Sequence, residues 1–244
     1  MPKFKDYPRD GSANGDIINP GEAHVPAVIL IDASGSMTPV GHLVTKALQE
    51  FKEAIEENSY AYGKVELCII VYNDDVTIVH PFTSMYDFKV PEIVYGGGTS
   101  THKGIDVALS QIKERKKQYV ERKTPYYRPW LFLLTDGYST DEDNGAYQRL
   151  LEAQRNKNCT FFAVGIGNDF NREELKSMHK DGILLTASKE NISGALSFLS
   201  NSLCRVSDSN PDDKVVCRII QNYLVIRVGI GNSAKAVAQE GERT

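Results

Sequence analysis

The chain has 244 residues, 41% of them hydrophobic, which is enough to bury a sizeable core in one large domain or two small ones. Its formal net charge is -4, from 28 Lys and Arg against 32 Asp and Glu residues, and this balance argues against nucleic acid as a partner. The longest apolar runs, residues 27–31 and 131–134, are far shorter than the ~20 residues of a membrane-spanning helix. The polar N-terminus lacks a signal-peptide stretch, so we expect a cytoplasmic protein without membrane contact.

Cysteine and histidine give no sign of a metal site. None of the four cysteines belongs to a C-x-x-C pair, so we expect neither a zinc site nor a disulfide. The five histidines show no metal-ligand spacing and are expected to be structural or exposed. His102 is the one to watch, because it lies close to a glycine-rich loop described below.

Hydrophobic periodicity alternates along the chain between strand-like runs and amphipathic helical segments. Residues 64–72 and 76–81 flank an Asn-Asp-Asp turn, which predicts a hairpin. Alternating strands and helices predict a doubly wound α/β fold, with a mostly parallel central sheet, one antiparallel edge strand and helices on both faces. In chain order we predict a strand at 25–31, a helix opened by Pro39 and ending near Asn58, the two hairpin strands, a helix through 105–123, a strand at 130–134, a helix near 143–156, a strand at 160–166, a helix near 172–179, a short strand at 183–186 and a last helix capped by Asn191.

The predicted domain spans residues 25–206. Residues 1–24, rich in Gly, Asn, Asp and Pro, are expected to form an extended or disordered arm. Residues 207–244 are expected to be a C-terminal extension, with a β-prone hairpin candidate at 215–228 and a disordered end from Gly229. The charged stretch 113–123 is expected to be a mostly solvated helix end.

A polar motif follows the first predicted strand directly. The aliphatic residues 28–31 are typical of a strand buried on both faces, and they run into Asp32, Ser34 and Ser36. These polar residues therefore begin at the carboxyl end of a buried strand, where ligands bind in open α/β sheets. They alternate with small residues, so three oxygen side chains can converge on one point. Hard oxygen donors suit a hard cation such as Mg²⁺.

Two further segments end at the same edge of the predicted sheet. They are the glycines 96–98 followed by Thr99, and Thr135–Gly137 after the strand at 130–134. Each segment has a simpler explanation when taken alone. Asp32 could cap a turn with the two serines, the glycines could be an ordinary flexible loop, and Asp136 could belong to an ordinary turn.

Together these segments resemble the von Willebrand factor type A domain and its metal-ion-dependent adhesion site. The family pattern is Asp-x-Ser-x-Ser in a first loop, a Thr after a Gly-rich turn, and an Asp at the end of the fourth strand. This chain matches the pattern in order and spacing between residues 26 and 203. The resemblance implies a site for Mg²⁺, or for Mn²⁺ or Ca²⁺, whose ligands are Asp32, Ser34, Ser36, Thr99 and Asp136.

Within that family the chain looks most like the bacterial tellurium-resistance-type proteins, a likeness carried by residues 128–141 and 162–167. The resemblance implies a non-enzymatic module in a bacterial stress system, which binds a Glu or Asp carboxylate of a protein partner through the metal. A kinase or a phosphatase is a candidate partner. The glycine loop could also switch Thr99 between direct and water-mediated contact with the ion.

Two other functions remain open from the residues. One is a metal-assisted hydrolase or phosphoryl-transfer enzyme, although the sequence offers neither a clear general base nor a Gly-x-Ser-x-Gly nucleophile elbow. The other is a scaffold whose metal is merely structural. Several neighbours have two interpretations: Met37 and Tyr138 either pack or border the ligand face, and Asp106 either faces solvent or supports the site from outside.

Overall fold

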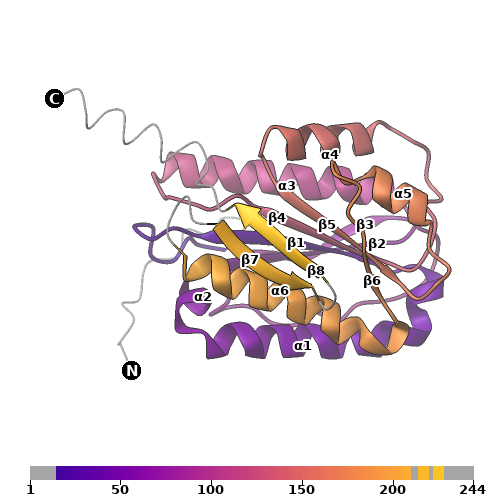
Figure 1. Ribbon diagram of the computed structural model, residues 1–244, viewed down its shortest axis with the longest axis horizontal. Coiled ribbons are helices and arrows are strands. Elements are labelled where there is room, and N and C mark those ends of the chain that lie inside the picture. The colour runs from indigo at the N-terminus through magenta and orange to yellow at the C-terminus, as the bar shows by residue number, and fades with distance from the viewer. Residues whose placement is uncertain (1–14, 210–213, 220–221, 228–244) are drawn as a thin grey trace.

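The computed structural model describes residues 15–209, 214–219 and 222–227, and its core is a sheet covered by helices on both faces (Figure 1). The helices are α1 (Gly41–Glu57), α2 (Ser59–Lys64), α3 (Thr101–Glu121), α4 (Ala146–Arg155), α5 (Arg172–Ser177) and α6 (Ile192–Ser207). The strands are β1 (Val25–Asp32), β2 (Val65–Tyr72), β3 (Val76–Ser84), β4 (Trp130–Thr135), β5 (Thr160–Ile166) and β6 (Leu185–Ala187), with β7 (Lys214–Ile219) and β8 (Asn222–Arg227) in a separate antiparallel hairpin.

The six-stranded sheet has the order β3-β2-β1-β4-β5-β6, and only β3 runs antiparallel to its neighbour. Helices α1 and α6 cover one face, and α3, α4 and α5 cover the other (Figure 1). The predicted doubly wound α/β fold is therefore confirmed. The chain leaves β1 toward β2 on one side and later returns as β4 on the other side. That reversal makes the carboxyl ends of β1 and β4 the switch point of the sheet, where such folds bind ligands.

Strand β1 is buried along its whole length. Its side chains alternate between the two layers: Ile29 and Ile31 join the core under α1 and α6, whereas Val28 and Leu30 join the core under α3 and α4. A strand buried on both faces needs an apolar run rather than an alternating pattern, which is why residues 28–31 are all aliphatic. The same burial carries Asp32, the last residue of β1, into the protein interior.

The predicted elements differ from the structure chiefly around the first helix. Pro39 does not open α1 but lies inside a short 3-10 helix, Gly35–Val40, and α1 begins at Gly41. The tighter turn starts because the Met37 amide donates to the carbonyl of Ser34, at 3.1 Å. Asn58 ends α1 as expected, but its side chain also accepts from the Tyr60 and Ala61 amides and so starts α2, which the periodicity did not predict.

Smaller differences concern the ends of other elements. Strand β5 has the predicted bounds, whereas α4 and α5 are shorter than predicted. Strand β6 starts two residues later and ends one residue later than the predicted strand at 183–186. Asn191 occupies the position before α6, but its side chain makes no capping hydrogen bond. None of the helices in the described part of the chain is both long enough and apolar enough to cross a membrane.

The two terminal segments are described only in part. In the segment expected to form an arm, the Gly15 amide donates to the Phe82 carbonyl at 2.6 Å and Ile17 is buried. Residues 1–14 lie outside the described residues, as does the end expected to be disordered from Gly229. In the C-terminal extension, β7 contacts α6.

The expectation that residues 113–123 are mostly solvated is wrong at Arg115, which is 1% exposed. The Arg115 Nε donates to Glu66 Oε2 at 2.7 Å, and the hydroxyl of the buried Tyr119 donates to the same oxygen. His24 Nδ1 lies 3.1 Å from the other oxygen of Glu66. The last turns of α3 run over the start of β2, where Glu66 is buried, so the helix needs a cation on this face.

Burial raises the pKa of Glu66, but the charges of His24 and Arg115 outweigh it and hold the pKa below the ordinary value of 4.5. A carboxyl whose pKa is lower in the folded state stabilises the fold above its unfolded pKa and loses that contribution as the pH falls. We therefore expect the free energy of unfolding, measured by urea denaturation, to decrease as the pH is lowered below 4.5. The decrease should be smaller in Glu66→Gln; an equal decrease in both proteins would contradict this account.

At neutral pH, Glu66→Gln should lower the free energy of unfolding by about 3–5 kcal/mol, because it leaves the guanidinium of Arg115 buried without its counter-charge. The matched control is Glu121→Gln on α3, the helix that carries Arg115, and it breaks an exposed pair with Lys117. The control should cost less than about 1 kcal/mol. Urea denaturation at one pH measures the free energy of unfolding of both variants. Similar decreases in the two variants would show that the buried Glu66 pair stabilises the fold no more than the exposed pair does.

Candidate metal centre

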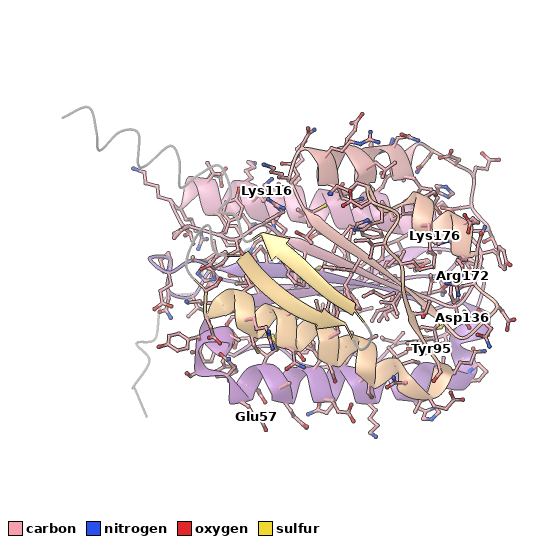
Figure 2. The ribbon with its side chains drawn as sticks, viewed as in Figure 1. Glu57, Tyr95, Lys116, Asp136, Arg172 and Lys176 are labelled. Carbon is pink, nitrogen blue, oxygen red and sulfur yellow. The ribbon has the colours of Figure 1, made fainter. Side chains whose placement is uncertain are left out.

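The five residues predicted to bind metal come from three loops at the switch point of the sheet. Asp32 ends β1, and Asp136 follows β4, whose Leu134 pairs with Ile31 of β1. Thr99 lies in the loop that leads into α3. Figure 2 shows Asp136 toward one end of the molecule, the end to which the carboxyl ends of the parallel strands point.

Asp32 is fully buried, and both of its carboxylate oxygens accept hydrogen bonds. Oδ1 accepts from the Ser34 amide at 2.9 Å, and Oδ2 accepts from the Thr135 hydroxyl at 2.6 Å. Burial raises the pKa of Asp32, the nearby charge of Asp136 raises it further, and the hydrogen bonds from Ser34 and Thr135 oppose the rise. The site thus holds a desolvated carboxylate beside a second acidic group, an arrangement that a cation would stabilise.

The two serines join the first loop to Asp136. The Ser36 hydroxyl donates to Asp136 Oδ1 at 2.6 Å and lies 3.0 Å from the Ser34 hydroxyl. Ser34 and Asp136 are buried, whereas Ser36 is exposed. These side-chain oxygens therefore extend from the protein interior to the surface, so a ligand from solvent can reach the site at Ser36.

Thr99 faces the same space from the third loop. A methyl group placed on Gly137 would lie 3.8 Å from Thr99 Oγ1, 3.9 Å from Ser36 Oγ and 4.0 Å from Asp32 Oδ2. Oxygens of the first loop and of the glycine loop therefore converge on one point beside Gly137 of the third loop. Asp136, the residue before Gly137, is joined to these oxygens through Ser36. The donors are two carboxylates and three hydroxyls, which is a set of hard oxygen ligands and fits a cation such as Mg²⁺.

Clusters of the more usual kind are missing from the described residues, which contain no group of three or more His, Cys, Asp or Glu side chains able to hold a metal. The candidate centre depends on hydroxyl groups instead. The parallel pairing of β1 with β4 brings these hydroxyls close to Asp32 and Asp136, although Ser36 and Asp136 are 100 residues apart in the chain.

The glycine loop is tied to its neighbours by backbone hydrogen bonds. The Gly96 amide donates to the Ala33 carbonyl at 2.8 Å, and the Gly35 amide donates to the Gly97 carbonyl at 3.1 Å. Gly97 has a φ of +79°, and a side chain there would also collide with Asp74. The loop thus needs glycine in order to pass close to the first loop. Switching of Thr99 by this loop stays a prediction.

Three residues that hold the site together were not singled out from the sequence. Asp74, in the β2–β3 turn, accepts from the Gly98 amide at 2.9 Å. Thr140 accepts from the Thr99 amide at 2.9 Å, and Asp141 accepts from the His102 and Lys103 amides at 3.2 and 3.0 Å. All three use side-chain oxygens to bind distant backbone amides.

The structure also shows where the residues next to the predicted ligands lie. Met37 is buried in the core, whereas Tyr138, two residues after Asp136, is 58% exposed. Asp106 accepts from Arg149 at 2.7 and 2.9 Å and so links α3 to α4. His102 is buried, with its ring stacked on Tyr147 at 4.1 Å between centroids.

Ser139, His102 and Asp141 meet, but not in the geometry of a nucleophile relay. Ser139 Oγ lies 3.1 Å from His102 Nδ1, and Asp141 Oδ1 lies 2.9 Å from the same nitrogen. In a relay the imidazole is the base, and the nucleophile and the orienting carboxylate contact different ring nitrogens. Burial raises the pKa of Asp141, but hydrogen bonds from Ser139, His102 and the backbone hold it below the ordinary value, so this carboxylate is ionised at neutral pH.

Comparison with known proteins supports the fold. A family model described as the von Willebrand factor type A domain matches residues 27–200. A search of curated protein sequences found no significant match. A solved structure described as von Willebrand factor type A from Catenulispora acidiphila is 17% identical with a TM-score of 0.57, and the match covers 80% of this chain and 45% of that one.

Two further solved structures are similar at the level of the fold. Proximal thread matrix protein 1 from the mussel byssus, solved with zinc in its metal-ion-dependent adhesion site, is 18% identical with a TM-score of 0.54, over 75% of this chain and 46% of that one. The ArnB paralog VWA2 from Sulfolobus acidocaldarius is 17% identical with a TM-score of 0.52, over 86% of this chain and 57% of that one.

This chain corresponds to about half the length of these solved structures. The family model, by contrast, matches well over half of this chain, from the middle of β1 into α6. The chain belongs to the von Willebrand factor type A domain family.

Proposed function

We propose that this domain is a metal-dependent protein-binding module in which Asp32, Ser34, Ser36, Thr99 and Asp136 hold Mg²⁺, with Mn²⁺ and Ca²⁺ as alternatives. The observation that carries the proposal is the convergence of oxygens of Asp32, Ser36 and Thr99 on the point beside Gly137, with Asp136 bonded to Ser36. The zinc-bound adhesion site of the similar mussel protein supports it. When bound, the ion supplies an electrophile that accepts a carboxylate oxygen from a partner.

The donor set favours capture of a carboxylate over bond cleavage. Three of the five donors are neutral hydroxyls, so the protein leaves the cation less neutralised than a cage of carboxylates would. Asp32 already accepts two protein hydrogen bonds and supplies negative charge from the interior. A Glu or Asp side chain of a partner protein would supply a further oxygen ligand to the ion at the exposed edge, beside Ser36.

The proposed setting is a cytoplasmic stress or tellurium-resistance system of bacteria, with a kinase or phosphatase as the partner. This proposal rests on the likeness of residues 128–141 and 162–167 to tellurium-resistance-type proteins. The competing proposal is a metal-assisted hydrolase or phosphoryl-transfer enzyme. The Ser139–His102–Asp141 contact disfavours it, because the His102 nitrogen nearest the Ser139 hydroxyl is also in contact with the Asp141 carboxylate.

Metal binding is the first test. We expect Mg²⁺ or Mn²⁺ to raise the melting temperature of the wild-type protein, because a ligand that binds only the folded state stabilises it. Ser36→Ala should weaken this effect by removing one donor at the surface, and Asp32→Ala should abolish it. Asp181→Ala, which removes an exposed carboxylate after α5, is the control and should keep it. Thermal melts and isothermal titration with each metal measure the effect.

In these titrations, the wild-type protein and Asp181→Ala should bind the metal, and Asp32→Ala should not. Equal metal affinity in all variants would contradict the assigned site. A screen of ester and phosphoester substrates with Mg²⁺ or Mn²⁺ tests the competing enzyme; turnover that depends on Asp32 would favour the enzyme over the binding module.

Partner capture is the second test, and Tyr138 offers a matched pair of variants. Tyr138 is 58% exposed beside the Asp136 loop, and Tyr60 is 63% exposed on α2. The measurement is the amount of protein that the domain retains from a bacterial extract in Mg²⁺ and releases on addition of a chelator. Tyr138→Ala should retain less, because an exposed aromatic ring at an interface gives a large contact area. Tyr60→Ala should retain the same amount as the wild type. Retention that survives both the chelator and Asp32→Ala would refute metal-dependent capture.

A further inference from the structure

Thr140 and Asp141 are consecutive residues of the β4–α4 loop, and together they connect this loop to the segment that carries Thr99. The Thr140 amide donates to the Thr99 carbonyl, and the Thr99 amide donates to the Thr140 hydroxyl, both at 2.9 Å. Thr99 is therefore held through both polar groups of its own backbone. Its side chain stays free to face the point beside Gly137.

Asp141 fixes the helix that follows Thr99. Ser100 occupies the capping position of α3 but makes no side-chain capping bond. Asp141 takes over that role from another loop, since its two oxygens accept from the His102 and Lys103 amides at 3.2 and 3.0 Å. A carboxylate at a helix N-terminus is favourable because the unpaired amides and the helix dipole attract negative charge.

The Asp141 carboxylate is itself held in place. The Ser139 hydroxyl donates to Oδ1 at 2.7 Å, and the ring of His102 contacts the same oxygen at 2.9 Å. His102 is in turn stacked on Tyr147, whose hydroxyl donates to Glu174 Oε1 at 2.6 Å. The start of α3 is thus fastened to the loop after β4 through Asp141, and to α4 and α5 through the His102 ring.

We propose that Thr140 and Asp141 are positioning residues that set the distance between Thr99 and Asp136 in the metal centre. Asp136 lies four residues before Thr140 in the same loop, so bonds from this loop to the Thr99 segment fix the two ligands relative to each other. This inference rests on the proposed metal site. It adds two residues outside the set of five proposed metal ligands.

Thr140 allows a clean test, because its side chain is exposed and its removal leaves no buried cavity. Thr140→Val keeps the shape but removes the acceptor for the Thr99 amide, and Thr140→Ser keeps the acceptor. The control, Thr77→Val, changes an exposed threonine on β3 far along the chain. With Mg²⁺ or Mn²⁺ alone in isothermal titration, Thr140→Val should bind about 10-fold more weakly. Thr140→Ser and Thr77→Val should bind as the wild type does, and all melting temperatures without metal should agree closely.

Asp141 gives an independent variant. Asp141→Asn keeps the size but loses the negative charge and replaces one acceptor by a donor facing a backbone amide. Affinity for the same metals should fall about 10- to 100-fold. Its control is Glu142→Gln, which removes the neighbouring charge on an exposed side chain and should leave affinity unchanged.

The outcomes separate this inference from the proposed function. If the wild-type protein binds neither metal, the proposed function itself fails. If the wild type binds but Thr140→Val and Asp141→Asn bind equally well, the positioning role is overturned while the metal site stands. Equal weakening by Thr140→Val and Thr140→Ser would also overturn it, since the hydroxyl would then not be responsible. Weakening in both Val and Asn variants with rescue by Ser supports it.

Discussion

The presence of two acidic side chains, Asp32 and Asp136, at the switch point is the constraint on which the rest of the site depends. Asp32 is carried into the interior by a strand buried on both faces, and the charge of Asp136 acts on it there. Like charges in a poorly solvated place destabilise the fold unless donors or a cation offset them. The Ser34 amide, the Thr135 hydroxyl and the Ser36 hydroxyl supply the protein's own donors.

Around this pair, the loops consist of small and hydroxyl-bearing residues, because the main chains and the hydrogen-bond donors are crowded into a small volume. The Gly97 carbonyl accepts from the Gly35 amide, so two loops touch through their main chains. Gly137 leaves open the point at which oxygens of Asp32, Ser36 and Thr99 converge. A larger side chain at Gly137 would occupy the space that a cation and its water ligands need.

Sequence patterns predicted the fold and the three loops well, since both depend on local signals. An aliphatic run followed by a polar motif marks the carboxyl end of a buried strand, and the order of strands and helices then places the loops at one edge. The polar contacts that hold the loops together could not be predicted in this way. Asp74 and Asp141 bind backbone amides 24 to 39 residues away, and such pairs leave no spacing signature.

The charged stretch 113–123 also contains a long-range contact that its sequence could not predict. Arg115 lies among lysines and glutamates that are exposed or only partly buried, and nothing in its immediate sequence separates it from them. Its burial is decided by Glu66, which is 49 residues away on β2. Composition predicts that a charged helix end is solvated, and only the tertiary packing of α3 on the sheet identifies the exception.

Glu66 and Asp32 are two buried carboxylates of one domain, and their surroundings differ in a way that bears on function. Glu66 faces Arg115 and His24, and these partners hold its pKa below the ordinary value in spite of burial. Within the described residues, no cationic side chain pairs with Asp32, whose neighbours are hydroxyls, an amide and a second carboxylate. The fold can therefore supply an internal counter-charge where it needs one. At the switch point it supplies neutral oxygen donors instead, which is the arrangement expected where the counter-charge is a metal ion taken from solution.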